Sequence, residues 1–183
     1  MREEHHHDAW ADMVRAADTH PPHRGALVRV GDFSIGAAGT RFLKPEDLDD
    51  FDVQVVLAME HPVPWRFGAH YNLLVAPLPD YGGVPPEWPA LVKTVIADLR
   101  AGRRVLAFCR ESHGRTGCLL ASLIAVLESA EETPDPILAV RERHCPSAVE
   151  TVDQAIAIFD LRGRALPELY IDEFERKRRM HGG

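Results

Sequence analysis

The chain has 183 residues, of which 45% are hydrophobic, and a formal net charge of −7 at pH 7. This length fits one domain with at most a short extra arm at either end. The acidic balance argues against general nucleic-acid binding and against binding to acidic membranes, since both attract an excess of Lys and Arg. No run of about eighteen apolar residues occurs, so we expect no transmembrane helix.

The three cysteines, Cys109, Cys118 and Cys145, are an odd number without close pairing. That pattern favours a reducing cytoplasm over a disulfide framework. The first residues are polar and lack the apolar segment of a signal peptide. We therefore expect a cytoplasmic protein with an amino-terminal arm over 1–25, including a short helix at 9–17, followed by one folded domain over 26–183.

Taken in chain order, the domain begins with runs rich in Val and Leu that predict strands at 26–30, 53–59 and 71–76. Between the first two, Pro45 to Leu48 read as a helix start with acidic residues near the positive end of the dipole. A loop rich in Pro and Gly over 77–86 precedes a predicted helix at 88–100.

A short apolar strand is predicted at 105–108 and a strongly apolar helix at 115–127, with a tight loop between them. Two further helices should begin at Asp135, an N-cap before Pro136, and at Thr151, which has capping-box spacing to Gln154. The charged run 173–179 reads as a solvated helix end. Strands mixed with helices predict an α/β fold, in which a central mixed, mostly parallel sheet is flanked by helices.

The loop from Cys109 to Arg115 carries the most chemical information. Successive backbone N–H groups in a strand-to-helix turn can converge on an anion, and the helix N-terminus adds positive potential. Gly114 lets the backbone turn closely. A thiol at Cys109 should lose its proton more readily in that field and become a usable nucleophile. The guanidinium of Arg115 suits two equatorial phosphate oxygens.

This segment, Cys109, five residues, Arg115 and Thr116, resembles the signature of the protein tyrosine phosphatase superfamily. The resemblance runs from about residue 26 to 161, and it implies a compact catalytic domain of the dual-specificity type that needs no metal or organic cofactor. It implies that Cys109 attacks phosphorus and that Arg115 and the loop amides stabilise the charge. The Thr116 hydroxyl is expected to bond to the departing sulfur. The residues expected to contact substrate are Arg110, Glu111, Ser112, His113, Gly114, Tyr81 and Gln154.

A phosphatase of this kind also needs a general acid. Asp80, in a loop of prolines and glycines, resembles the acid-bearing loop of the compact members, and it is favoured over Glu87 or His70. A turn aspartate bonded to its own backbone is the structural alternative. Tyr81 beside it, with Trp65 and Trp88 as further candidates, is expected to line the substrate entrance.

Downstream, the run that ends in Thr151 and Gln154 resembles a family segment whose Gln positions water or contacts the phosphate site. A plain helix-capping role for Gln154 is an equal alternative. Cys118 is expected to be a small core residue, with the trapping of oxidised Cys109 as its alternative role.

Three loop residues depart from the family pattern. Phe108 replaces the usual His, Ser112 stands where Gly is common, and Glu111 places an acid near an anion site, where we expect it to point outward. Arg110 and His113 add positive character that would suit a polyanionic substrate.

Phosphorylated proteins are the expected substrates, with lipid, nucleotide or RNA phosphates as alternatives. Two other functions stay open. One is a phosphate-binding module without turnover, and the other is sulfur transfer of the rhodanese type. A metal-dependent hydrolase is disfavoured, because no His, Asp or Glu cluster has ligand spacing along the sequence.

Overall fold

The computed structural model describes residues 23–58 and 72–181. Its elements in chain order are β1 (Arg24–Val30), β2 (Phe33–Gly39), the 3₁₀ helix η1 (Pro45–Leu48), β3 (Val53–Val56), β4 (Asn72–Val75), α2 (Trp88–Arg100), β5 (Val105–Cys109), α3 (Gly114–Leu127), α4 (Pro136–Arg143), α5 (Val152–Asp160) and α6 (Glu168–His181). The helix expected at 9–17 and most of the expected arm lie outside the described residues.

Five strands form one sheet in the order β1-β2-β5-β3-β4. The β1 and β2 strands pair antiparallel, whereas β5 is parallel to both β2 and β3, and β3 is parallel to β4. The predicted mixed, mostly parallel sheet is therefore confirmed. Since β5 is the central strand, the loop that follows it opens at the carboxyl edge of the parallel strands, where α/β folds place their sites.

The β2 strand is absent from the sequence prediction, because its residues FSIGAAG include Gly and Ala, which are poor strand formers. These small residues have a packing role. A Cβ on Gly36 would lie 2.5 Å from the Phe51 ring, so the glycine allows the ring to lie against the sheet.

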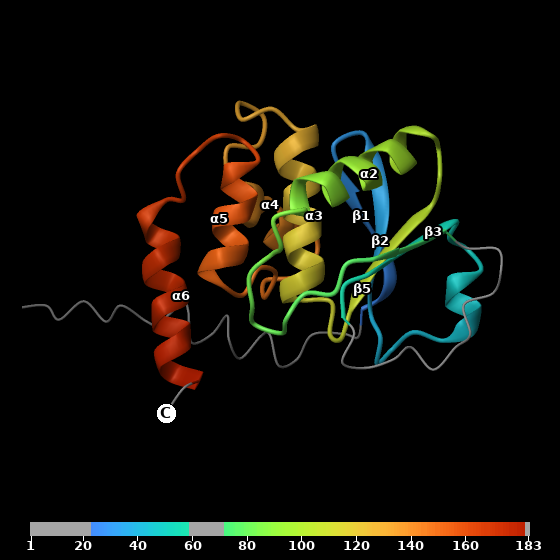
Figure 1. Ribbon diagram of the computed structural model, residues 1–183, viewed down its shortest axis with the longest axis horizontal. Helices are drawn as coiled ribbons and strands as arrows, with labels where there is room; N and C mark the ends of the chain where they lie inside the picture. The colour runs from blue at the N-terminus through green and yellow to red at the C-terminus, as the bar shows by residue number, and fades with distance from the viewer. Residues whose placement is uncertain (1–22, 59–71, 182–183) are drawn as a thin grey trace, which may run out of the picture.

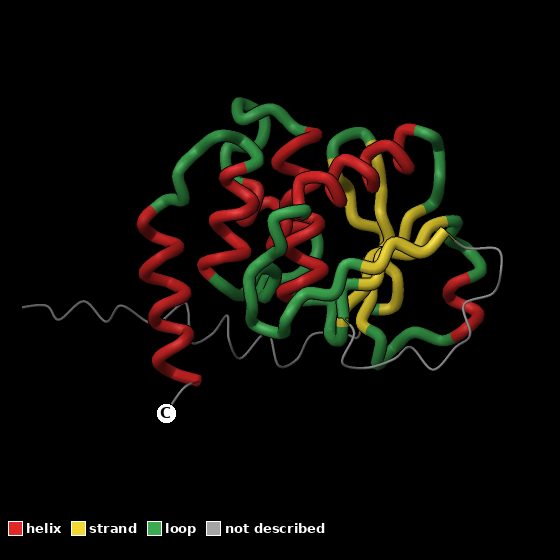
Figure 2. Tube along the Cα trace, viewed as in Figure 1, coloured by secondary structure: helices red, strands yellow, loops and turns green. Residues whose placement is uncertain are grey.

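The two faces of the sheet are covered differently (Figures 1 and 2). One face packs against α2 and α3, with α4, α5 and α6 in the same large apolar cluster. The opposite face is covered by the chain around η1, through a smaller cluster that includes Leu43, Leu48 and Phe51. Alternation along β5 places Phe108 in the smaller cluster and Cys109 in the larger one.

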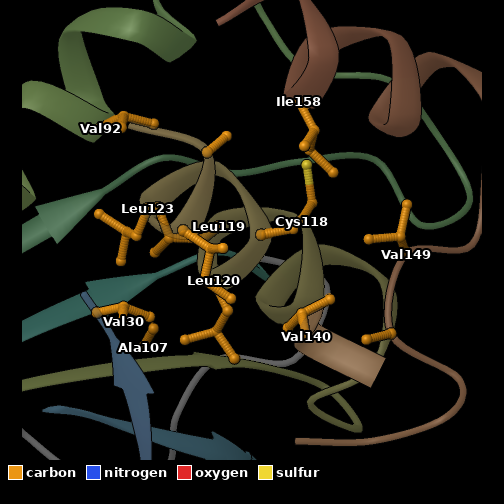
Figure 3. Close-up of a cluster of buried hydrophobic side chains, with 14 of the residues drawn as sticks. Val30, Val92, Ala107, Cys118, Leu119, Leu120, Leu123, Val140, Val149 and Ile158 are labelled. Atoms are coloured by element: carbon orange, nitrogen blue, oxygen red, sulfur yellow. The ribbon is translucent and has the colours of Figure 1, made fainter. Parts of the chain in front are cut away.

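The central helix of the larger cluster is α3, whose side chains point outward to several neighbouring elements at once (Figure 3). Leu119, Leu120 and Leu123 are fully buried. Cys118 is buried among them, with its thiol 3.9 Å from the Gln154 carbonyl oxygen, and burial raises its pKa. Its predicted place in the core is confirmed. All three cysteines are free thiols.

Most predicted helix starts are confirmed at the level of individual hydrogen bonds. Asp135 caps α4, because its Oδ1 accepts from the N–H groups of Ile137 and Leu138 at 2.9 Å. Thr151 caps α5 by accepting from the Gln154 N–H. The reciprocal half of the capping box is not formed, since the Gln154 Oε1 accepts instead from the Glu150 N–H at 2.9 Å.

The solvated character predicted for 173–179 is wrong for one face of α6. Phe174 is buried there, and Glu173 pairs with Arg141 of α4 and with Lys177. A short charged segment hides such a contact, because only Glu173, Phe174 and Lys177 face the protein. None of the helices in the described ranges has the length and apolar character needed to cross a membrane.

Candidate active site

The predicted nucleophile stands at the end of the central strand. Cys109 is the last residue of β5, and α3 begins at Gly114, so the intervening residues form the tight loop that the sequence predicts. The first N–H groups of α3 face this loop end, where an anion is stabilised by the helix dipole.

Ser112 gives the loop its sharpest bend. Its φ is +68°, a left-handed conformation that usually favours Gly, so the departure seen in the sequence is a real backbone constraint. The Ser112 carbonyl oxygen lies 2.6 Å from Nε2 of His144, and its Oγ lies 3.3 Å from the same nitrogen. Because a carbonyl only accepts, Nε2 of His144 carries the proton. His144, which the sequence prediction missed, braces the loop from behind.

Arg115 is held in place by the acid-bearing loop. Its side chain is 3% exposed, and Nη2 lies 3.1 Å from Oδ1 of Asp80, whose side chain is 43% exposed. Nη1 also donates to the carbonyl oxygen of Leu78 at 3.3 Å. The guanidinium therefore has a fixed position at the rim of the loop, where its fork can face an oxyanion.

The loop that carries Asp80 is tied to the start of α5. The carbonyl oxygen of Gly82 accepts from Nε2 of Gln154 at 3.2 Å and from Oγ1 of Thr151 at 3.3 Å. Gln154 is fully buried, and both ends of its amide are engaged. In this structure Gln154 positions the acid-bearing loop and does not line the cavity.

These segments enclose one cavity of about 220 Å³. Its lining residues are Asp80, Tyr81, Cys109, Arg110, Glu111, His113, Gly114, Arg115 and Glu150. Sites for drug-sized ligands occupy roughly 300–1,000 Å³, so this cavity suits a small group such as a phosphate, with the rest of a substrate outside.

Two predicted site residues lie outside that lining besides Gln154. The side chain of Ser112, within the loop, is buried, and so is that of Thr116 in α3, and neither lines the cavity. Within the described part of the chain, the Thr116 hydroxyl has no hydrogen-bond partner. The bond from Thr116 to the sulfur of Cys109, expected from the family resemblance, is therefore not formed in this structure.

Glu111 has its charge balanced by two arginines. Its Oε1 lies 2.8 Å from Nη1 of Arg41 and 3.5 Å from Nε of Arg110. Glu111 thus contacts Arg41 of a neighbouring segment, but it does not simply point outward as expected, because it also lines the cavity. The pairing reduces the repulsion that Glu111 would otherwise exert on an incoming anion.

The aromatic residues expected at the substrate entrance have different outcomes. Tyr81 lines the cavity, whereas Trp88 is buried in the core and donates from Nε1 to Ser122, so its predicted place at the entrance is wrong. Trp65 lies outside the described residues, as does His70. The other alternative acid, Glu87, is exposed and does not line the cavity.

Glu150 is a cavity residue that the sequence prediction did not single out. A Cβ on Gly114 would lie 2.0 Å from its Oε2, so the carboxyl group lies directly against the start of α3. Burial, followed by the negative charge of Asp80, raises the pKa of Glu150 to about 7, and Lys177, Arg115 and the Gly114 N–H oppose that rise. Glu150 follows the Cys145–Ala148 turn by two residues and belongs to the site because it contacts Gly114. The two residues are far apart in sequence, so no local pattern indicates this contact.

Comparisons with known proteins bear on the fold of the chain. No protein-family model matches the chain. An uncharacterized protein of Methanocaldococcus jannaschii, MJECL20, is 39% identical over 83 residues, which is 44% of this chain and 53% of that protein. The chain thus aligns with about half the length of this curated relative.

Solved structures match most of the fold. Tk-PTP in its active form has a TM-score of 0.62 at 22% identity, over 75% of this chain and 97% of that one. Kinase-associated phosphatase with serine at its catalytic-site cysteine has a TM-score of 0.64 at 15% identity, over 79% and 96%. The chain therefore has the fold of the protein tyrosine phosphatase superfamily in its dual-specificity-like form.

Proposed function

We propose that this protein is a cysteine-dependent phosphatase that hydrolyses phosphate monoesters through a cysteinyl-phosphate intermediate. One observation carries the proposal: Cys109, Arg115 and Asp80 line a single cavity, and the guanidinium of Arg115 lies 3.1 Å from the carboxylate of Asp80. A nucleophile, an anion-binding fork and a proton donor are the three groups that phosphoryl transfer to a thiol requires.

In the first step, the Cys109 thiolate attacks phosphorus and the P–O bond to the leaving group breaks. Asp80, protonated, gives its proton to the departing oxygen. Arg115 and the N–H groups at the start of α3 stabilise the charge on the equatorial oxygens, and such preorganised electrostatics supplies much of the rate gain.

In the second step, Asp80 accepts a proton from a water molecule that attacks the cysteinyl-phosphate. The S–P bond breaks, which releases phosphate and restores the Cys109 thiolate. The thiolate is a better leaving group when a hydroxyl donates to it. The Thr116 hydroxyl, which has no partner in the described part of the chain, would supply that donor only if its side chain turned toward Cys109.

Phosphorylated proteins are the substrates we propose. Asp80 and Tyr81 are exposed at the rim, whereas the cavity of about 220 Å³ is smaller than a site for a drug-sized ligand. An exposed rim suits a phosphorylated side chain that extends from a larger surface. Of the extra loop cations, Arg110 does not require a polyanion, because it already faces Glu111, whose charge Arg41 also balances.

The test is hydrolysis of an aryl phosphate in the presence of a metal chelator, with wild type beside Cys109→Ser. Chelator-resistant turnover that disappears in the variant supports the proposal, because a hydroxyl is far less acidic than a thiol. Turnover that survives in Cys109→Ser would identify a different nucleophile. Phosphate binding without turnover on aryl phosphates or phosphopeptides would favour a binding module, and sulfur transfer from thiosulfate would favour rhodanese-type chemistry.

A further inference from the structure

A cluster of metal-ligating side chains lies against the phosphate-binding loop. His23, His113 and Cys145 each offer one ligand atom, and these atoms all lie within 4.8 Å of one another. The residues come from three separate segments: His23 precedes β1, His113 belongs to the loop, and Cys145 follows α4. No spacing along the sequence connects them, so only the fold brings them together.

The surroundings of this cluster hold its members in place. His23 is 9% exposed and Cys145 is fully buried. The rings of His23 and His113 meet edge to face with centroids 5.4 Å apart, and the ring of His144 lies 4.4 Å from that of His23. The Gly39 N–H donates to the His23 carbonyl oxygen at 2.9 Å. These contacts fix the position of His23 beside the loop.

The chemistry of the donors selects a class of ion. Two imidazoles and one thiolate suit Zn²⁺ and related divalent transition metals, whereas Mg²⁺ and Ca²⁺ prefer oxygen ligands. Tetrahedral Zn²⁺, with bonds of about 2.0–2.3 Å, places its ligand atoms about 3.5 Å apart. The cluster would contract by roughly 1 Å to reach that geometry. Three protein ligands leave the fourth position to water or an anion.

We propose that His23, His113 and Cys145 form a binding site for a divalent transition-metal ion of the Zn²⁺ type, distinct from the nucleophile Cys109. His113 also lines the cavity, which gives the ion a path from solvent. On binding, the Cys145 thiol loses its proton to solvent and the thiolate joins the two neutral imidazoles as a ligand.

Occupation of the site also affects the loop, a consequence that rests on the proposed phosphatase function. Contraction of the cluster pulls His113 toward His23 and Cys145, and with it the loop amides that face phosphate. Misplacement of catalytic groups by about 1 Å costs on the order of a hundredfold in rate. Bound Zn²⁺ should therefore inhibit turnover.

Absorption spectroscopy with Co²⁺, in place of Zn²⁺, tests the site without any assay of activity. A thiolate-to-cobalt charge-transfer band requires a sulfur ligand, so Co²⁺ bound only by the histidines at 5–7 would not produce it. The full-length reduced protein should give this band with one Co²⁺ per chain, and Zn²⁺ should displace it. Cys145→Ser should abolish the band, whereas Cys109→Ser should retain it.

His23→Gln keeps the proposal falsifiable if Cys145→Ser does not fold. This variant should bind Co²⁺ at least tenfold more weakly, keep its turnover in chelator and resist inhibition by Zn²⁺. No band in the wild type would overturn the proposal. A band lost in Cys109→Ser but retained in Cys145→Ser would place the ion at the nucleophile and overturn it as well. A band without phosphatase activity would support the site and remove only the proposed function.

Discussion

The guanidinium of Arg115 binds the carboxylate of Asp80, with Nη2 and Oδ1 3.1 Å apart. The residue expected to hold phosphate therefore also holds the expected proton donor. On the proposed function, an incoming phosphate is expected to compete with Asp80 for the same fork. The contact joins the Asp80 loop to the start of α3, and both residues line the cavity.

Asp80→Asn should separate the role of Asp80 as proton donor from its role as the anionic partner of Arg115. Loss of the proton donor should slow turnover by about two to four powers of ten for substrates with poor leaving groups. Activated aryl phosphates need less protonation and should be affected less. Inorganic phosphate should bind more tightly as a competitive inhibitor, because Arg115 loses an anionic partner. Steady-state kinetics across a series of leaving groups measures all three effects.

The matched control is Glu87→Gln, which neutralises an exposed carboxylate near the same loop but outside the cavity. It should leave the dependence on leaving group unchanged. If the turnover rate depended on the leaving group in the same way in wild type and Asp80→Asn, Asp80 would have no part in the mechanism.

Glu150 should give stability an unusual dependence on pH. Burial and the charge of Asp80 raise its pKa from 4.5 to about 7. Between these values the folded state holds a proton that the unfolded state has lost, so the free energy of unfolding should fall as pH rises from about 5 to about 7. The decline from this group should be at most about 3 kcal/mol.

Urea unfolding at several pH values, wild type beside Glu150→Gln, isolates that contribution. The difference in unfolding free energy between the two proteins should shift steadily toward the variant across this range. A difference that does not change with pH would contradict the assignment, whatever the absolute stability of either protein.

The signals that predicted this fold and site are local ones. Cys109 to Arg115 are continuous in sequence, between an apolar strand and an apolar helix, so the phosphate-binding loop can be read directly. Asp135 and Thr151 are caps whose partners lie two or three residues away. The turn chemistry of its loop and the family resemblance both point to Asp80, and this residue lines the cavity.

What the sequence prediction missed depends on long-range contacts. The β2 strand is rich in Gly and Ala, and Gly36 leaves room for the Phe51 ring. Glu150 joins the cavity across the fold, and His144 reaches the Ser112 carbonyl from 32 residues away. No periodicity or spacing records such contacts, because each depends on how two distant segments pack.

A buried side-chain amide in β3 lowers the stability of the fold. Gln54 is fully buried, and neither its Oε1 nor its Nε2 has a hydrogen-bond partner in the described part of the chain. An unsatisfied buried polar group costs about 1–3 kcal/mol. Gln54→Leu should therefore raise the free energy of unfolding by about 1 kcal/mol or more, as measured by urea titration.

Gln154→Leu is the matched control for Gln54→Leu, since it makes the same change at a buried amide whose two ends are both bonded. It should lower stability, because it leaves the Glu150 N–H without its acceptor. If both substitutions destabilised the protein equally, hydrogen bonding would not be what distinguishes the two sites.

The attachment of α6 should depend on one carboxylate. Glu173 accepts from both terminal nitrogens of Arg141, at 2.9 and 2.8 Å, and lies 2.7 Å from Nζ of Lys177. Burial alone would raise the pKa of Glu173, but the bonds from these two cations hold it below its ordinary value. The pairing therefore stabilises the fold above the ordinary pKa and is lost as pH falls through the lowered one.

Glu173→Gln leaves two cations facing each other with little solvent, since the side chains of Arg141 and Lys177 are 11% and 19% exposed. Breaking such a pair from one side costs roughly 3 kcal/mol, and urea unfolding at neutral pH should show a loss of that order. The exposed Glu175 on the same helix provides the comparison, because Glu175→Gln should change stability by no more than about 0.5 kcal/mol. Equal effects of the two substitutions would mean that α6 is held by its apolar contacts through Tyr170 and Phe174 alone.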